Sequence, residues 1–155
     1  MTNDVVFRPL DSLQTMAYII KKCRELRTPY NITKLQKLMY CCYGVTLATT
    51  GTPLCNEQPE AWQYGPVFPT VLKYMQANGI DKTGDKVIDV DIPDEIDKLI
   101  VGTITFFGEF TASQLSSWSH RCGSPWYQAS AGGVNLKTKI SDAAIKDYFA
   151  REVLA

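Results

Sequence analysis

The chain has 155 residues, 45% of them hydrophobic and 21% charged, which is typical of a soluble globule with one domain. Its 16 basic and 16 acidic residues cancel, which argues against nucleic-acid binding, because a basic surplus is the usual footprint of that function. A membrane span, a secretion signal and a disulfide framework are all absent from the pattern, so we expect a cytoplasmic protein whose five cysteines are free thiols.

The chain is expected to begin with an irregular lead-in, residues 1–11, followed by a first helix. Apolar side chains recur at helical spacing over Leu13–Cys23, which indicates one buried face. Ser12 or Asp11 can cap this helix, and Thr28-Pro29 ends it.

A long second helix is predicted over Lys34–Thr50. Thr33 and Gln36 have the spacing of a capping box, and Asn31 is the alternative cap. Gly51 stands where a left-handed residue commonly ends a helix.

The stretch Glu60–Pro69 combines Trp62 and Tyr64 with a glycine and two prolines. This composition predicts a stiff, shaped turn rather than a regular element. A third helix then begins at Pro66 or Pro69, since proline is tolerated in a first helical turn, and stops at Asn78-Gly79.

The next segment, Ile80–Ile92, is acidic, with aliphatic residues between its aspartates. We interpret Lys86–Val90 as a short strand. Its expected partner is a second short strand near Pro59–Gln63, and the two would form a small β-ribbon on a helical body.

Proline, glycine and capping residues mark the remaining helices. They are expected over Pro93–Gly108, over Thr111–Gly123 with a Thr111–Gln114 capping box, from Ser124 in a short helix, and after Ser141, where Ile140 and Ile145 form a hydrophobic staple. The second of these helices is expected to turn Leu115, Trp118 and Cys122 inward, and residues 130–139 to form a loop. The predicted fold is mainly α: a single compact domain, residues 1–155, of about six helices, with room for the two-stranded ribbon.

No constellation for catalysis or metal binding emerges. Cys41 and Cys42 are adjacent, so on a helix they point about 100° apart, and His120 with Cys122 is not a zinc pattern. His120 is the sole histidine, which removes most acid–base schemes at neutral pH and favours a structural role near the Ser124-Pro125-Trp126 turn. We therefore expect no metal, no cofactor and no enzymatic activity.

Aromatic residues and charge distribution favour a protein partner instead. The chain has three Trp, eight Tyr and six Phe, and Trp62, Tyr64 and Trp126 lie on expected turns. Trp and Tyr dominate binding hot spots, although both tryptophans could equally fill the core beneath their turns. Net charge is +4 over residues 1–56, −6 over 57–110 and +2 over 111–155. Separated charge suits a partner of complementary sign, and solvated faces are the alternative.

Two strings carry a resemblance to a known family. Lys34–Tyr40 reads Lys-Leu-Gln-Lys-Leu-Met-Tyr, and Glu60–Val67 reads Glu-Ala-Trp-Gln-Tyr-Gly-Pro-Val. With Gly123–Trp126 and Ile145–Phe149, they resemble the Panacea domain family, which includes SocA-type proteolytic adaptors and GepA-like prophage proteins. The resemblance extends over Leu13–Phe149, nearly the whole chain.

The resemblance implies a non-enzymatic antitoxin that neutralises a cognate bacterial or prophage toxin by direct protein contact. The alternatives are an adaptor that delivers the toxin to a ClpXP-type protease, and a DNA-binding autoregulator that uses Thr111–His120 as its recognition helix. The acidic stretch 81–97 is a candidate steering patch. No oligomeric state follows from the sequence. The candidate partner-binding residues are Lys34, Lys37, Tyr40, Trp62, Tyr64, Gly65, Pro66 and Trp126.

Overall fold

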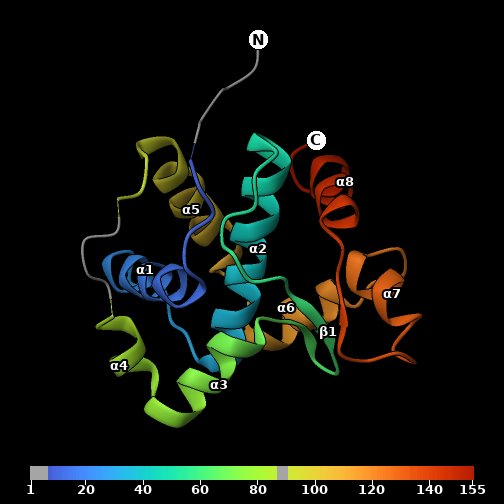
Figure 1. The fold of residues 1–155 in the computed structure, drawn as a ribbon, viewed down its shortest axis with the longest axis horizontal. Helices are drawn as coiled ribbons and strands as arrows, with labels where there is room; N and C mark the ends of the chain where they lie inside the picture. Colours follow the sequence, from blue (N-terminus) through green and yellow to red (C-terminus); the bar gives the residue numbers. More distant parts are fainter. Residues whose placement is uncertain (1–6, 87–90) are drawn as a thin grey trace.

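A computed structural model describes residues 7–86 and 91–155 and confirms a mainly α fold (Figure 1). The described residues form eight helices and a three-stranded antiparallel sheet of order β2-β1-β3. The helices are α1 (Ser12–Glu25), α2 (Ile32–Thr50), α3 (Pro69–Asn78), α4 (Ile80–Gly84), α5 (Asp94–Phe107), α6 (Ala112–Ser119), α7 (Pro125–Ser130) and α8 (Asp142–Glu152). The strands are β1 (Glu60–Trp62), β2 (Gly65–Val67) and β3 (Thr138–Lys139).

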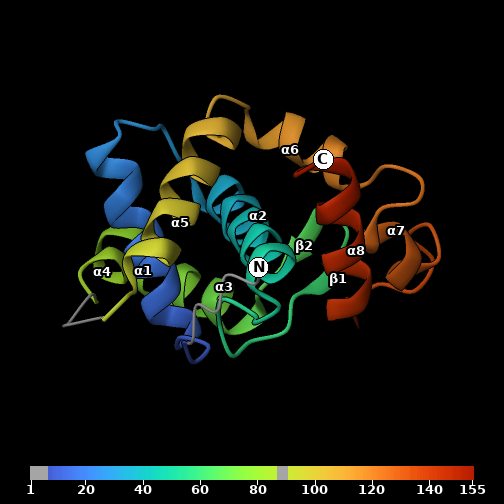
Figure 2. The same cartoon turned by 90° about the horizontal axis from the view of Figure 1, so that it is seen from above.

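Helix α2 is the centre of the molecule, and every residue from Lys34 to Leu47 is buried. A helix buried on all sides needs neighbours on each face. Figure 2 shows α1 and α5 on one side of α2, and α8 with the strands on the other. The contact with α8 is close: Gly44 lies against the ring of Phe149, and that ring meets Tyr40 edge-to-face at 5.5 Å between centroids.

Local capping signals set most helix starts. Asn31 caps α2 by accepting a 2.8 Å hydrogen bond from the Lys34 amide, so the Thr33–Gln36 box was wrong and the alternative cap is confirmed. Thr33 lies inside the first turn because the helix already begins at Ile32. At α1, Asp11 is the cap and Ser12 is the first helical residue.

Two further capping predictions are confirmed, and one prediction about a buried side chain was wrong. The Thr111–Gln114 capping box is present at α6, and Ser141 caps α8. The expected inward position of Cys122 was wrong: α6 already ends at Ser119, and the Cys122 side chain is exposed. The helical spacing continues through the sequence here, but the backbone turns after His120 to reach α7.

The short strand expected near Pro59–Gln63 is present as β1, whereas the irregular turn expected over residues 60–69 is mostly a β-hairpin. Glu60 pairs with Val67, and Trp62 with Gly65, across a two-residue turn. Pro66 is tolerated because β2 is an edge strand, where a missing N–H costs no ladder hydrogen bond.

The third strand comes from a segment expected to be a loop. Glu60 and Ala61 pair with Lys139 and Thr138 of β3. The strand predicted at Lys86–Val90 falls largely on residues 87–90, which lie outside the described residues. The two described neighbours of β1 are β2 and β3, so the ribbon has three strands in place of two.

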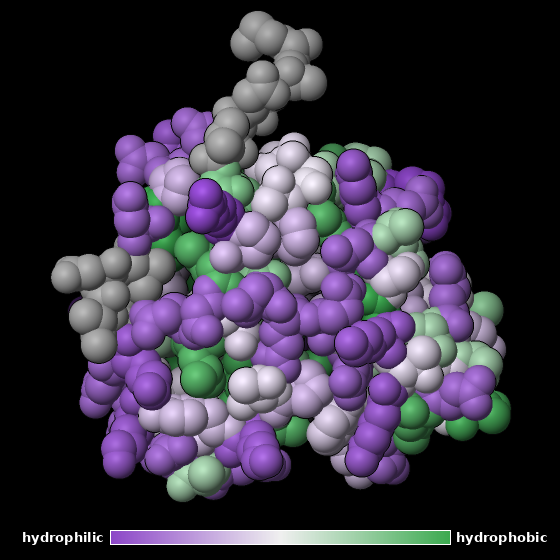
Figure 3. Space-filling view, viewed as in Figure 1, coloured by the Kyte–Doolittle hydropathy of each residue, from purple (hydrophilic) through white to green (hydrophobic). Residues whose placement is uncertain are grey.

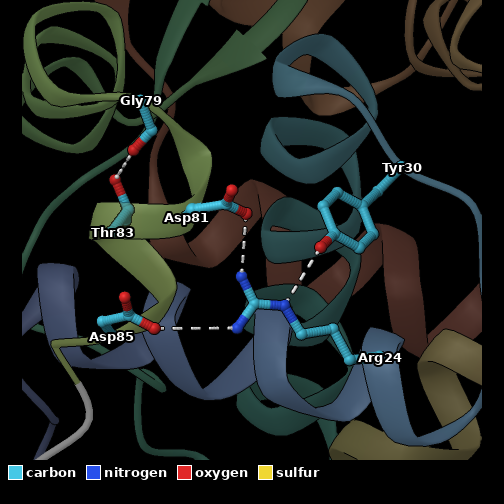
Figure 4. A network of polar contacts seen from close by, with 6 residues as sticks. All are labelled: Arg24, Tyr30, Gly79, Asp81, Thr83 and Asp85. Atoms are coloured by element: carbon cyan, nitrogen blue, oxygen red, sulfur yellow. Dashed lines mark hydrogen bonds and ion pairs between the residues drawn. The ribbon is translucent and has the colours of Figure 1, made fainter.

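Helix α4 was not predicted. An arginine of α1 forms ion pairs with it and with the residue after it (Figure 4). Arg24 contacts Asp81 at 3.2 Å and Asp85 at 3.9 Å, and donates to the Tyr30 hydroxyl at 3.2 Å. Exposed ion pairs contribute little stability, so this network mainly orients α4. Part of the acidic stretch 81–97 is thereby engaged within the chain, as is Asp97, which lies 3.2 Å from Lys22.

The close approach of α2 and α8 can be tested with a pair of glycine substitutions. In Gly44→Ala the new methyl group would overlap the Phe149 ring, so we expect a loss of about 2–3 kcal/mol in the free energy of unfolding. In Gly102→Ala, on α5, the methyl group meets nothing within 4 Å, and higher helix propensity should add about 0.5–1 kcal/mol. Urea unfolding measures both; equal effects would contradict the packing described here.

Candidate functional site

The hairpin β1–β2 carries an exposed tyrosine at its tip. We call residues 60–69 together with Trp126 the aromatic corner. The Tyr64 side chain is 67% exposed. The carbonyl groups of Gln63 and Tyr64, at the tip, contact side chains of α6 and its C-terminal cap. Ser116 Oγ donates to the Tyr64 carbonyl at 2.8 Å, and His120 Nε2 lies 2.8 Å from the Gln63 carbonyl. The tip is therefore attached to α6 at two points.

Behind the tip, Gly65 allows the hairpin to sit directly on α2 and α6. Its φ of +119° is strained for any residue with a side chain. A Cβ there would lie 2.5 Å from Lys37 Cε and 2.8 Å from Ser119 Oγ. Glycine is thus required both by the backbone conformation and by the space available.

Lys37 lies beneath the corner as a buried cation. Its side chain is 2% exposed, and its Nζ donates to the Pro66 carbonyl over a long 3.5 Å contact. Burial lowers the pKa of Lys37 to about 8, because the ammonium loses its hydration. Lys34, one turn earlier, is also buried and donates to the Gly108 carbonyl at 2.6 Å, which joins α2 to the end of α5.

Trp126 and His120 support the corner from α7 and the end of α6. The Trp126 side chain is buried, and its Nε1 donates to the Trp62 carbonyl at 2.7 Å. The His120 ring meets it edge-on at 4.0 Å between centroids. The other imidazole nitrogen, Nδ1, lies 2.5 Å from the Ser116 carbonyl. Both ring nitrogens therefore face backbone carbonyls within the fold.

The eight sequence-predicted contact residues divide sharply by exposure. Tyr64 is exposed, and Trp62 is half-buried under Lys137, whose Nζ lies 5.2 Å from the ring centroid. The six buried residues are Lys34, Lys37, Tyr40, Gly65, Pro66 and Trp126. The corner brings six of the eight together, whereas Lys34 bonds to Gly108 at the end of α5 and Tyr40 packs against α8.

Sequence reasoning missed the exposed aliphatic residues beside the corner. Val134 is 81% exposed and Leu136 is 42% exposed, on the segment that leads into β3. Figure 3 shows apolar surface at the end of the molecule where, in Figure 1, α7 and the segment after it lie. Nothing in the local pattern of this segment distinguishes it from a solvated loop; only the pairing of β3 with β1 brings it next to Trp62.

The described residues offer little for covalent or metal chemistry. No three His, Cys, Asp or Glu side chains among them lie close enough to hold a metal ion. Burial raises the pKa of the thiols of Cys23, Cys41, Cys42 and Cys55, which keeps them protonated. Over the same residues, no helix combines the length and apolar character needed to cross a membrane.

Comparisons with known proteins bear on this site. The family model described as Antitoxin SocA-like, Panacea domain matches residues 35–127. The chain is also 33% identical, over 155 aligned residues, to Antitoxin SocA of Caulobacter vibrioides (strain NA1000 / CB15N), with 90% of this chain and 82% of that protein covered. No solved structure matches the chain. The matched range begins in α2 and ends in α7, so it contains the whole aromatic corner.

The seating of the hairpin predicts a large cost for a side chain at Gly65. We expect Gly65→Ala to lower the free energy of unfolding by about 2–4 kcal/mol, from backbone strain plus the clash with Lys37 and Ser119. Gly123→Ala is the matched control, since φ there is +85° with nothing within 4 Å, and should cost about 1 kcal/mol. Thermal unfolding of both variants measures the difference. Similar losses in the free energy of unfolding would contradict the close contact of Gly65 with Lys37 and Ser119.

Burial of Lys37 predicts a pH-dependent gain from its removal. The pKa is about 8 in the folded chain and has an ordinary value of 10.5, so between these values the unfolded state binds more protons and stability rises with pH. Below pH 8 the full penalty of about 3 kcal/mol applies. Lys37→Met should therefore be more stable than the wild type at pH 7, with the advantage shrinking by pH 10.

Urea unfolding of both proteins at the two pH values checks this, because the thiols and tyrosines that also titrate are common to both. A stability difference that stays constant with pH would contradict the burial of an unpaired ammonium at this position.

Proposed function

This chain belongs to the SocA-like, Panacea-domain antitoxin family, as its motifs indicated, and we propose that it neutralises a protein toxin by direct contact at the aromatic corner, without catalysing a reaction. The family supports an antitoxin role and, with it, a toxin as the partner. Direct contact, and the corner as its place, are our proposal.

The observation that carries this proposal is the exposed Tyr64 on a hairpin tip that is already fixed. Contacts from Ser116 and His120 hold the carbonyls of the two turn residues, Tyr64 and Gln63. A surface that is ordered before binding loses little conformational entropy when a partner docks. Tyrosine is also among the residues that most often dominate protein interfaces.

The eight candidate residues then divide into two roles. Tyr64 and Trp62 are proposed to touch the toxin, since they are the ones with accessible surface. The other six are proposed to hold the corner in shape, through the Lys37–Pro66, Lys34–Gly108 and Trp126–Trp62 hydrogen bonds and the packing of Tyr40, so their substitution would act through the fold.

Non-enzymatic action is supported by the state of the reactive groups. Both His120 ring nitrogens face backbone carbonyl oxygens of the fold, which supports a structural role for the imidazole. The four buried thiols are protonated, which makes them poor nucleophiles. These groups contribute to the fold, which supports contact as the proposed mode of action.

Tyr64→Ser tests the proposed contact. Co-expression of the wild-type chain with a growth-arresting product of an adjacent gene should restore growth, and Tyr64→Ser should lose this relief, with affinity for the toxin at least about tenfold weaker. Its melting temperature should stay close to that of the wild type, because the side chain is exposed. Leu26→Ser is the control, since Leu26 is 40% exposed at the C-terminal cap of α1, away from the corner.

The same assay separates direct neutralisation from delivery to a protease. In cells lacking a ClpXP-type protease, relief by the wild-type chain should persist, because an occluded toxin needs no degradation. Relief that vanishes in those cells, or full relief by Tyr64→Ser, would overturn the proposal.

A further inference from the structure

A groove of about 550 Å³ lies away from the corner, between α5, α6 and the C-terminal end of α8. Its apolar lining is formed mainly by Phe106, Phe107, Phe110, Leu115, Trp118 and Val153. A second hollow of about 250 Å³ shares Phe106, Phe107 and Val153 with it, so the two form one surface, which we call the aromatic groove. Figure 2 shows α6 between α5, on one side of α2, and α8, on the other.

The groove exposes large apolar side chains that fold stability alone does not require. Phe106 is 61% exposed, Phe110 38% and Leu154 47%. Phe106 meets Phe107 edge-on at 4.9 Å and Phe110 at 6.0 Å, so the exposed rings rest on a packed aromatic base. Trp118 lies on the other side of Phe107 at 5.2 Å. Contiguous exposed aromatic surface of this kind commonly marks a binding site.

The charges at the groove are mostly positive. Arg121 lines the main hollow and Lys98 the second one, and among the described residues neither has a carboxylate within 4 Å. The one carboxylate in the lining, Glu152, lies 3.6 Å from Arg151 Nη1, and Arg151 also contacts Asp147 at 3.0 Å, so the lining itself carries two cations and one carboxylate. An apolar floor between two free cations is complementary to an apolar segment that carries negative charge.

We propose that the aromatic groove docks an acidic amphipathic helix of a partner protein. Its apolar residues, at the i, i+3, i+4 and i+7 spacing of a helix face, pack on Phe106, Phe110 and Leu154. Its carboxylates approach Arg121 and Lys98. The inference does not depend on the proposed toxin contact, because no residue of the aromatic corner lines the groove.

A designed peptide tests the chemistry of the groove directly. The probe is a fluorescent helix of about 18 residues, or five turns, with Leu and Phe on one face and Glu on the other; a second peptide carries Lys in place of every Glu. Fluorescence anisotropy with the full chain should show micromolar binding of the acidic peptide and at least tenfold weaker binding of the basic one.

Two variants assign the binding to the groove. Phe106→Ser should weaken binding of the acidic peptide at least tenfold, and Arg121→Glu should reverse the preference between the two peptides. Both side chains are exposed, so the folded state should persist, which circular dichroism verifies. Val134→Ser replaces an apolar side chain that is even more exposed, on the segment before β3; it is the control and should leave binding unchanged.

Three results would overturn the proposal: binding of neither peptide, binding of the acidic peptide that Phe106→Ser leaves intact, or no effect of charge reversal at Arg121. A second copy of the chain is the other molecule that could occupy this groove, and sedimentation of the chain alone tests for it. A dimer that Phe106→Ser dissociates would assign the groove to a second copy and refute a partner helix. The toxin contact at the corner is tested by growth relief with Tyr64→Ser, and the groove is tested by peptide binding. Failure of one proposal is therefore distinguishable from failure of the other.

Discussion

Helix α2 is buried on every side, and three of its polar side chains connect it to other segments. A buried polar group without a partner costs free energy, so these contacts constrain where the neighbouring segments lie. Gln36 accepts from the Phe68 amide at 2.7 Å, Lys37 donates to Pro66, and Lys34 donates to Gly108. Two of these bonds hold the hairpin and one holds the end of α5. The same burial that forms the core thereby attaches the aromatic corner to it.

Over the described residues, the interior contains several hydrogen-bonded polar side chains, and the surface carries aromatic side chains at both the corner and the groove. At the corner, Tyr64 is exposed and Trp62 is half-buried, and buried side chains of α2 and α7 hydrogen-bond to the hairpin that carries them. At the groove, exposed phenylalanines rest on Phe107 and Trp118. In both places a packed layer orders the aromatic rings above it. Rigid aromatic surface over an ordered base suits recognition of another polypeptide, in keeping with membership of an antitoxin family.

The elements that sequence analysis found are those whose signals are local. Helix starts at Asp11, Thr111 and Ser141 depend on a side chain that bonds an amide two or three residues ahead, and such spacing is visible in the sequence. The elements it missed depend on distant partners. Strand β3 has two residues and exists because Glu60 and Ala61 pair with it, and the five-residue α4 is oriented by an arginine on α1.

By itself, the sequence determined the mainly helical fold, most helix positions and the family. Only the tertiary structure decided which candidate side chains face outward. Lys37 reads as a surface cation and is buried, while Tyr64, in an apolar string, is exposed. The reason is physical. Helix α2 has neighbours on all faces, so the spacing of its polar and apolar residues does not indicate which side chains are exposed. A hairpin tip has no periodicity at all, and the fold alone sets its exposure.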